Sequence, residues 1–185
     1  MQTFAVYVDN KPGVLNRVSS LIRRRAFNIE SLTVGHSETP GLSRMTIVVD
    51  TDERGAALVE ANLYKLFPVR RVNNITKVPT IARDMALIKV AVGSDARAQV
   101  MQLSEVYRCR VVDVSPDSLI LETTGAEDKI DSLVEVLRPY GVIEMVRTGR
   151  IEMARGGSAP AHDIVVKQNA AKHTAQAIDP SLGSV

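Results

Sequence analysis

The sequence predicts an α+β protein with two consecutive units, each ordered strand, helix, strand, strand, helix, strand. Short apolar runs alternate with segments whose apolar residues recur every three or four positions. The six-element order occurs twice in succession. In each unit a proline-containing turn, Pro40-Gly41 or Pro116-Asp117, separates the two central strands. Helices in this order must pack on one face of an antiparallel sheet, which is the ferredoxin-like arrangement.

The first unit is expected over residues 1–78. Its strands are predicted at residues 2–9, 28–36, 43–50 and from 69 to about 78. The first helix is predicted at residues 13–25, because Val14, Val18 and Ile22 recur on one face. Thr51-Asp52-Glu53 provides an N-cap and an acidic first turn for the second helix.

The second unit is expected over residues 85–155, after a linker at residues 79–84. Its strands are predicted at residues 86–92, 110–114, 118–124 and 142–147. Ser94-Asp95 is expected to cap its first helix. Residues 156–185 are rich in Ser, Ala, Pro, Gln and His, so they are expected to form a disordered tail.

The composition argues against membrane and nucleic-acid partners. The longest uncharged apolar runs are strand-length, and the N-terminus is strand-like, so a cytoplasmic location without a membrane span is expected. The net charge is only +2 and aromatic residues make up 4%, too few for RNA recognition by base stacking. Arg23-Arg24-Arg25 is interpreted as a helix end. For Arg70-Arg71, contact with an acidic partner and an exposed position are equally open.

No residues are predicted to be catalytic or to bind a metal. Cys109 is the only cysteine, and the three histidines are scattered along the chain. The acids Glu127, Asp128 and Asp131 begin a predicted helix, where its dipole favours negative charge. No nucleophile–base arrangement or phosphate-binding glycine spacing is present.

The segment after the first strand has the features of a carboxylate site. Gly13 permits a tight strand-to-helix turn, and Pro12 fixes its geometry. The free N–H groups of Gly13 and Val14 at the helix N-terminus attract an anion, and Asn10 adds a short donor and acceptor. On local chemistry alone, an empty turn is an equal alternative.

Asn28-Ile29 is expected to complete this site. The pair begins the second strand, which we expect to lie beside the first strand and so near the Gly13 end of the first helix. A carboxylate would then bind the N–H groups of Gly13 and Val14. An ammonium group would bind carbonyl oxygens of Asn10 and of the Asn28-Ile29 region. These residues therefore predict a pocket for the head group of a free amino acid.

The same residues resemble a known family. The segment Asp9–Val18 resembles the opening of an ACT domain, a small ligand-sensing module. Asn28–Val34 followed by Leu42–Ile47 resembles the regulatory, or small, subunit of acetolactate synthase, also called acetohydroxyacid synthase. The resemblance covers residues 1–155. It implies an ACT effector-binding domain followed by an ACT-like C-terminal domain.

The resemblance also implies a partner and an effector. The partner is the catalytic (large) subunit, which makes acetolactate in branched-chain amino-acid biosynthesis. Thiamine diphosphate, Mg and FAD are expected only in that subunit, with no cofactor in this chain. The small subunit is expected to activate it and to confer feedback inhibition, usually by valine, at the interface of an ACT homodimer. The matching effector-binding positions are Asn10, Gly13, Val14, Asn28 and Ile29. The alternative is a freestanding ACT-type amino-acid-binding regulator of another enzyme.

Overall fold

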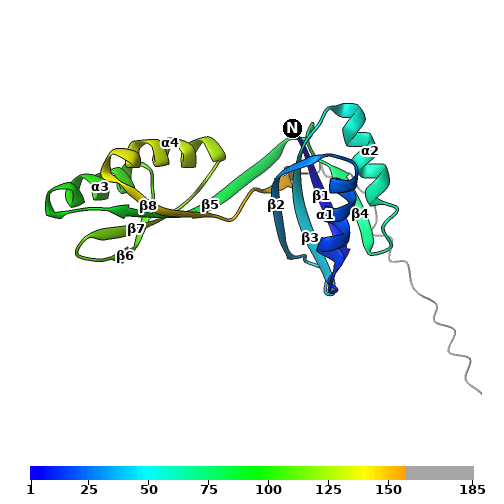
Figure 1. The fold of residues 1–185 in the computed structure, drawn as a ribbon, viewed down its shortest axis with the longest axis horizontal. Coiled ribbons are helices and arrows are strands. Elements are labelled where there is room, and N and C mark those ends of the chain that lie inside the picture. Colours follow the sequence, from blue (N-terminus) through cyan, green and yellow to red (C-terminus); the bar gives the residue numbers. More distant parts are fainter. Residues whose placement is uncertain (157–185) are drawn as a thin grey trace, which may run out of the picture.

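The computed structural model describes residues 1–156, which form two units joined by a two-stranded ribbon (Figure 1). The predicted tail lies outside the described residues, except for Gly156. Within the described residues, no helix has the length and apolar character needed to cross a membrane.

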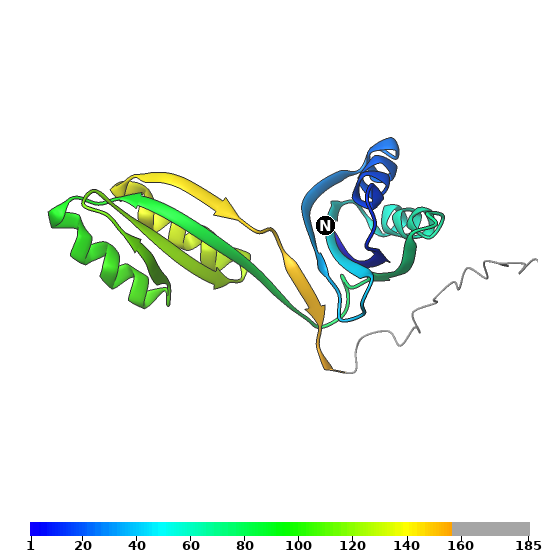
Figure 2. The ribbon, with the colours of Figure 1, turned by 90° about the horizontal axis from the view of Figure 1, so that it is seen from below.

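The first unit is an antiparallel four-stranded sheet with two helices on one face. Its elements are β1 (Gln2–Asp9), α1 (Val14–Arg24), β2 (Asn28–His36), β3 (Leu42–Asp50), α2 (Glu53–Leu63) and β4 (Val69–Asn74). The strand order is β2-β3-β1-β4. Helix α1 contacts β2 and α2 contacts β4, and both lie on the same side of the curved sheet (Figure 2). Phe4, Ile22 and Ile47 are fully buried in the core between these layers.

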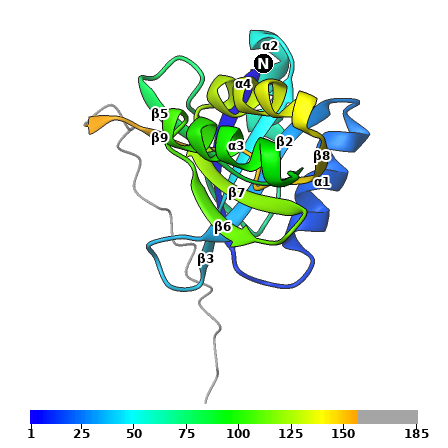
Figure 3. The ribbon, with the colours of Figure 1, turned by 90° about the vertical axis from the view of Figure 1, so that its left-hand side faces the viewer.

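The second unit repeats this plan. Its elements are β5 (Thr80–Ala91), α3 (Ser94–Val106), β6 (Arg110–Val114), β7 (Ser118–Gly125), α4 (Glu127–Leu137), a 3₁₀ turn (Arg138–Tyr140), β8 (Val142–Arg147) and β9 (Ile151–Ala154). The main strand order is β6-β7-β5-β8. Helices α3 and α4 lie on one face of the sheet (Figure 3). Ile88, Leu121 and Leu133 are fully buried in the core. The predicted α+β class with two ferredoxin-like units is confirmed.

The strand order corrects one expectation. Strand β2 pairs with β3 and not with β1, because β3 turns back from β2 and inserts between them. Strand β4 ends at Asn74, earlier than predicted. The Asn74 side-chain oxygen accepts hydrogen bonds from the Thr76 backbone N–H (3.0 Å) and hydroxyl (2.6 Å), which starts a turn.

The helix caps match the predictions in part. The Asp52 carboxylate caps α2 by accepting a hydrogen bond from the Gly55 N–H at 2.8 Å. Helix α3 follows Gly93, and no side chain caps it. The predicted cap residue Ser94 instead donates its hydroxyl to Asp95 at 2.9 Å.

The expected linker, residues 79–84, is mostly β-strand. Residues Thr80–Arg83 pair with β9, and residues Asp84–Ala91 of the same strand pair with β7. Strand β9 was not predicted. The chain returns along β5 after Gly149, and backbone hydrogen bonds between β9 and β5 join two segments that are distant in the sequence. The connection between the units is therefore an antiparallel ribbon.

Candidate functional site

The loop between β1 and α1 has the geometry expected of an anion site. Gly13 has φ +78°, in the left-handed region that glycine adopts without strain, and its Cα faces open space. No side chain caps α1, and its first turn contains no acidic residue. The Asn10 N–H donates to the Gly41 carbonyl at 2.9 Å, which fixes the backbone of this residue, and the Asn10 side chain is exposed. The Val14 side chain is in the core, and its backbone N–H already donates to the Lys11 carbonyl within the turn at 3.4 Å. The expectation that this N–H is free is therefore met only in part.

A buried ion pair fixes the start of this loop. The Arg70 guanidinium donates to both oxygens of Asp9, from Nε at 2.5 Å and Nη2 at 2.7 Å. The Arg70 and Asp9 side chains are 11% and 9% exposed, respectively. The hydrogen bonds from Arg70 hold the pKa of Asp9 below its usual range, although burial opposes this shift. Arg70 is therefore neither an exposed edge residue nor a free contact for a partner. The two residues are 61 positions apart, and local sequence patterns gave no signal for the pair.

Asn28 and Ile29 line a separate cleft. It has a volume of about 430 Å³ and lies between the start of β2 and the outer face of α1. The other lining residues are Asn16, Ser19, Ser20, Arg23 and Phe27. The Asn28 side chain is exposed and donates to the Glu30 carboxylate, whereas Ile29 is partly buried and packs against the core. Sequence reasoning missed the polar face of α1 that completes this cleft.

The structure does not bring the two halves of the predicted site together within one chain. Asp9 pairs with Leu42 at one end of the sheet, whereas Asn28 pairs with Asp50 at the opposite end. Helix α1 runs between these ends and has 11 residues. A helix of this length spans about 16 Å. The expectation that Asn28-Ile29 lies near the Gly13 end of α1 is therefore wrong for a single chain, because β1 and β2 run parallel.

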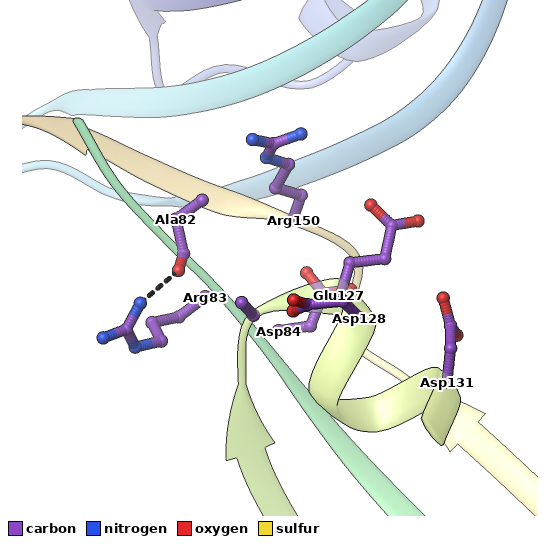
Figure 4. A pocket seen from close by; sticks show the side chains of 8 residues that line it. Ala82, Arg83, Asp84, Glu127, Asp128, Asp131 and Arg150 are labelled. Atoms are coloured by element: carbon purple, nitrogen blue, oxygen red, sulfur yellow. Dashed lines mark hydrogen bonds between the residues drawn. The ribbon is translucent and has the colours of Figure 1, made fainter. Parts of the chain in front are cut away.

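A second pocket lies where the ribbon meets the second unit (Figure 4). Its volume is about 400 Å³, and α4 contributes Glu127, Asp128 and Asp131. Asp131 pairs with Arg147 at 2.8 Å. Buried Asp84 lies beside the α4 N-terminus, whose dipole favours negative charge. The acids thus follow the predicted helix-start pattern. Among the described residues, no group of three or more acid, His or Cys side chains could hold a metal ion.

Two family profiles match the chain, one in each unit. A profile described as the AHAS small subunit-like ACT domain matches residues 4–71. A profile described as the small subunit of acetolactate synthase matches residues 83–156. The fold and the glycine loop thus define a two-unit protein whose first unit is an ACT domain.

Similarity to known relatives extends over both units. The chain is 47% identical to a probable acetolactate synthase small subunit of Archaeoglobus fulgidus, over 83% of this chain and 96% of the relative. It is 43% identical to the acetolactate synthase small subunit of Bacillus subtilis, over 80% and 87%. The crystal structure of the Thermotoga maritima small subunit superposes with a TM-score of 0.80 at 41% identity, covering 84% of this chain and 97% of that one.

The chain belongs to the acetolactate synthase small-subunit family. It is a regulatory small subunit with an ACT domain, and its family implies a catalytic large subunit as partner.

Proposed function

We propose that this chain activates the acetolactate synthase catalytic subunit and inhibits it when a branched-chain amino acid, valine first, binds between two ACT units. The observation that carries the proposal is the separation of the two polar half-sites. The uncapped N-terminus of α1 lies at one end of the helix, and the Asn28 cleft lies at the other.

A two-fold dimer through β2 joins these half-sites. Strand β2 is an edge of its sheet, with unpaired backbone groups along one side. Two antiparallel copies of β2 would set the start of one strand against the end of the other. That end lies beside Ser43, close to Gly41 and the Asn10 loop. An isologous interface of this kind contains two equivalent sites, each combining Asn10, Gly13 and Val14 of one protomer with Asn28 and Ile29 of its partner.

The chemistry of this combined site suits an aliphatic amino acid. The α1 N-terminus offers backbone N–H groups and a positive dipole end to a carboxylate. The Asn10 side-chain oxygen and nearby carbonyl groups accept hydrogen bonds from an ammonium group. The part of Ile29 that remains exposed offers an apolar contact to a branched side chain.

In this proposal the chemical reaction belongs to the catalytic subunit. Thiamine diphosphate, Mg and FAD remain there, and the complex works in the cytoplasm. The small subunit acts by allostery, so the effector must bind one arrangement of the complex more tightly than another.

The test is to mix the purified chain with the catalytic subunit and measure acetolactate formation with and without valine, leucine or isoleucine. We expect activation by the small subunit and inhibition by at least one of the three amino acids. Asn10→Ala is expected to raise the half-inhibitory concentration by about tenfold or more, the loss of one to two ligand hydrogen bonds, while activation remains. Lack of both activation and inhibition would instead favour a freestanding ACT-type regulator of another enzyme.

A further inference from the structure

We propose that a hydrogen-bonded contact between β2–β3 of the ACT unit and residues 148–152 transmits effector occupancy to the second unit. This inference rests on the proposed function and deepens it, because it names the residues that regulate through the same site. The contact, here called the junction contact, comprises Ser31, Thr33 and Arg44 of the ACT unit and residues 148–152.

The β2 side of the junction contact consists of short hydroxyl side chains. The Ser31 hydroxyl oxygen accepts a hydrogen bond from the Arg150 backbone N–H at 3.0 Å. The Thr33 hydroxyl donates to the Thr148 carbonyl at 3.5 Å. Gly149 lies between these bonds with φ +82°, and a Cβ there would be 3.2 Å from the Ser31 oxygen and 3.1 Å from the Thr33 oxygen. Close approach at this point therefore depends on glycine.

On the β3 side of the junction contact, Arg44 contacts the segment that contains the buried Glu152. Arg44 donates to the Glu152 backbone carbonyl and, at 3.0 Å, to the Thr46 hydroxyl. The Glu152 side chain is 5% exposed, accepts a hydrogen bond from Thr80 at 2.6 Å and pairs with Arg150 at 3.0 Å. The Thr80 and Arg150 contacts lie within the ribbon and fix the Glu152 segment there, and the bond from Arg44 to the Glu152 carbonyl joins that segment to β3. In Figure 4 the Arg150 guanidinium points away from the α4 acids and toward the strands of the first unit.

The junction contact is continuous with the proposed effector site at one end. Ser31 is two residues after Ile29 on β2, and the β2–β3 register shifts between them. Such a bulge is a local irregularity that changes the direction of the strand. A ligand that orders Asn28 and Ile29 therefore acts on the strand segment that carries Ser31.

At its other end the junction contact is tied to the second unit. The Met85 backbone N–H donates to the Thr148 hydroxyl at 3.2 Å, and the Thr148 N–H donates to the Met85 carbonyl at 3.0 Å. Met85 lies on β5, where nearby Ala86 and Ile88 are fully buried in the core of the second unit. From effector site to second core, the connection thus runs through β2, residues 148–150 and β5.

The proposal also assigns a direction to the coupling. In it, the effector-bound arrangement keeps the junction contact, and this contact holds the second unit in the inhibiting position. Removing the contact should uncouple inhibition from binding, because an effector shifts only an equilibrium in which the two states differ.

The test uses Ser31→Ala in the complex with the catalytic subunit, with Ser115→Ala as a matched control. Ser115 lies in the β6–β7 turn, and its hydroxyl donates to Asp113 near the end of β6 at 3.3 Å. For Ser31→Ala we expect valine binding within about twofold of wild type by calorimetry and retained activation, while the residual activity at saturating valine rises about fivefold or more, within the usual range of allosteric coupling. The control Ser115→Ala should match wild type in valine binding, in activation and in inhibition by valine.

Hydrogen exchange gives a second readout on the unmodified chain. Valine is expected to slow exchange of the Arg150 amide, because the bound state keeps its bond to Ser31. If Ser31→Ala does not fold, Thr33→Val tests the same contact with little change in shape.

Full valine inhibition in both variants, or loss of valine binding together with inhibition, would overturn the inference. In the second case Ser31 would belong to the effector site itself. If the wild-type chain neither binds valine, leucine or isoleucine nor responds to them, the proposed function fails, and this result is distinct from uncoupling.

Discussion

The two units share a fold but differ at the first strand-to-helix connection. In the ACT unit, α1 follows a left-handed glycine and has no acid in its first turn. In the second unit, α3 follows Gly93 in an extended conformation, and Asp95 occupies the first turn. The positive end of a helix dipole favours a negative charge, and in the second unit the Asp95 carboxylate supplies that charge. The comparison gives a physical reason to expect a bound carboxylate at the N-terminus of α1 and not at that of α3.

The largest expected effect on stability concerns the Asp9–Arg70 ion pair, which fixes the start of the loop between β1 and α1. Asp9→Ala leaves Arg70 buried without its partner, which should lower the free energy of unfolding by about 3 kcal/mol. Chemical denaturation measures this change in the free energy of unfolding. The control is Glu53→Gln in the Glu53–Lys77 pair, whose side chains are both 73% exposed. Its expected change is below about 0.5 kcal/mol. Equal effects of the two variants would contradict the role given to Asp9.

The same pair predicts an acid-dependent loss of stability. Arg70 lowers the pKa of Asp9 in the folded state relative to the unfolded chain. The stabilisation is therefore complete above the unfolded carboxyl pKa, about 4, and is lost as pH falls through the lower folded value. Denaturation between about pH 6 and pH 2 should show a smaller acid loss for Asp9→Asn than for wild type. Parallel curves would exclude Asp9 as the titrating group.

A pair of glycine substitutions compares the two connections directly. Gly13 has φ +78°. Forcing an L-residue into this region with Gly13→Ala should cost about 1–2 kcal/mol, with loss of valine inhibition. Gly93 is extended, so Gly93→Ala retains an allowed backbone. This control should change stability by less than about 0.5 kcal/mol.

Thermal unfolding and inhibition assays measure both glycine variants. A Gly13→Ala protein as stable and as sensitive as wild type would show that the loop needs no left-handed residue.

The smallest expected effect is in the second unit. Asp95→Ser removes the acid from the first turn of α3 and should cost about 0.3–1 kcal/mol from the helix dipole. It should create no second valine site, because Gly93 is extended and does not form the loop found at Gly13. Calorimetry with valine should give the wild-type stoichiometry. A doubled stoichiometry would mean that the acid in the first turn of α3 is the sole reason why the second unit has no valine site.

The sequence predicted local elements better than long-range pairing. Strands β1, β6 and β8 begin and end where alternation and turns predicted, because their signals lie within a few residues. Strand β9 is short and exists only because β5 lies beside it. The Asp9–Arg70 pair and the place of β3 between β1 and β2 depend on chain crossings that local patterns do not encode.

The candidate site was predictable in its chemistry but not in its geometry. The Asn10–Val14 loop has the backbone that glycine and proline indicated. Asn28 and Ile29 were expected near this loop because β2 was expected beside β1, and the resemblance supported the same choice. The structure places them at the opposite end of the sheet. The polar face of α1 was overlooked because helical periodicity identifies the apolar residues that pack on the core and gives no role to the polar residues opposite them.

The central claim is that each effector site combines the Asn10 loop of one protomer with the Asn28 cleft of its partner. Mixed dimers of Asn10→Ala and Asn28→Ala chains test it most directly. Each variant alone should bind valine about tenfold more weakly or worse at both sites. In a mixed dimer, one site carries both substitutions and the other carries neither.

Calorimetry on chains refolded or co-expressed together is therefore expected to recover tight valine binding at one site per mixed dimer. With random pairing, half of the dimers are mixed, so about a quarter of the wild-type sites should return. Recovery at wild-type affinity is the predicted result. No recovery in dimers shown to be mixed would contradict a site shared between two chains.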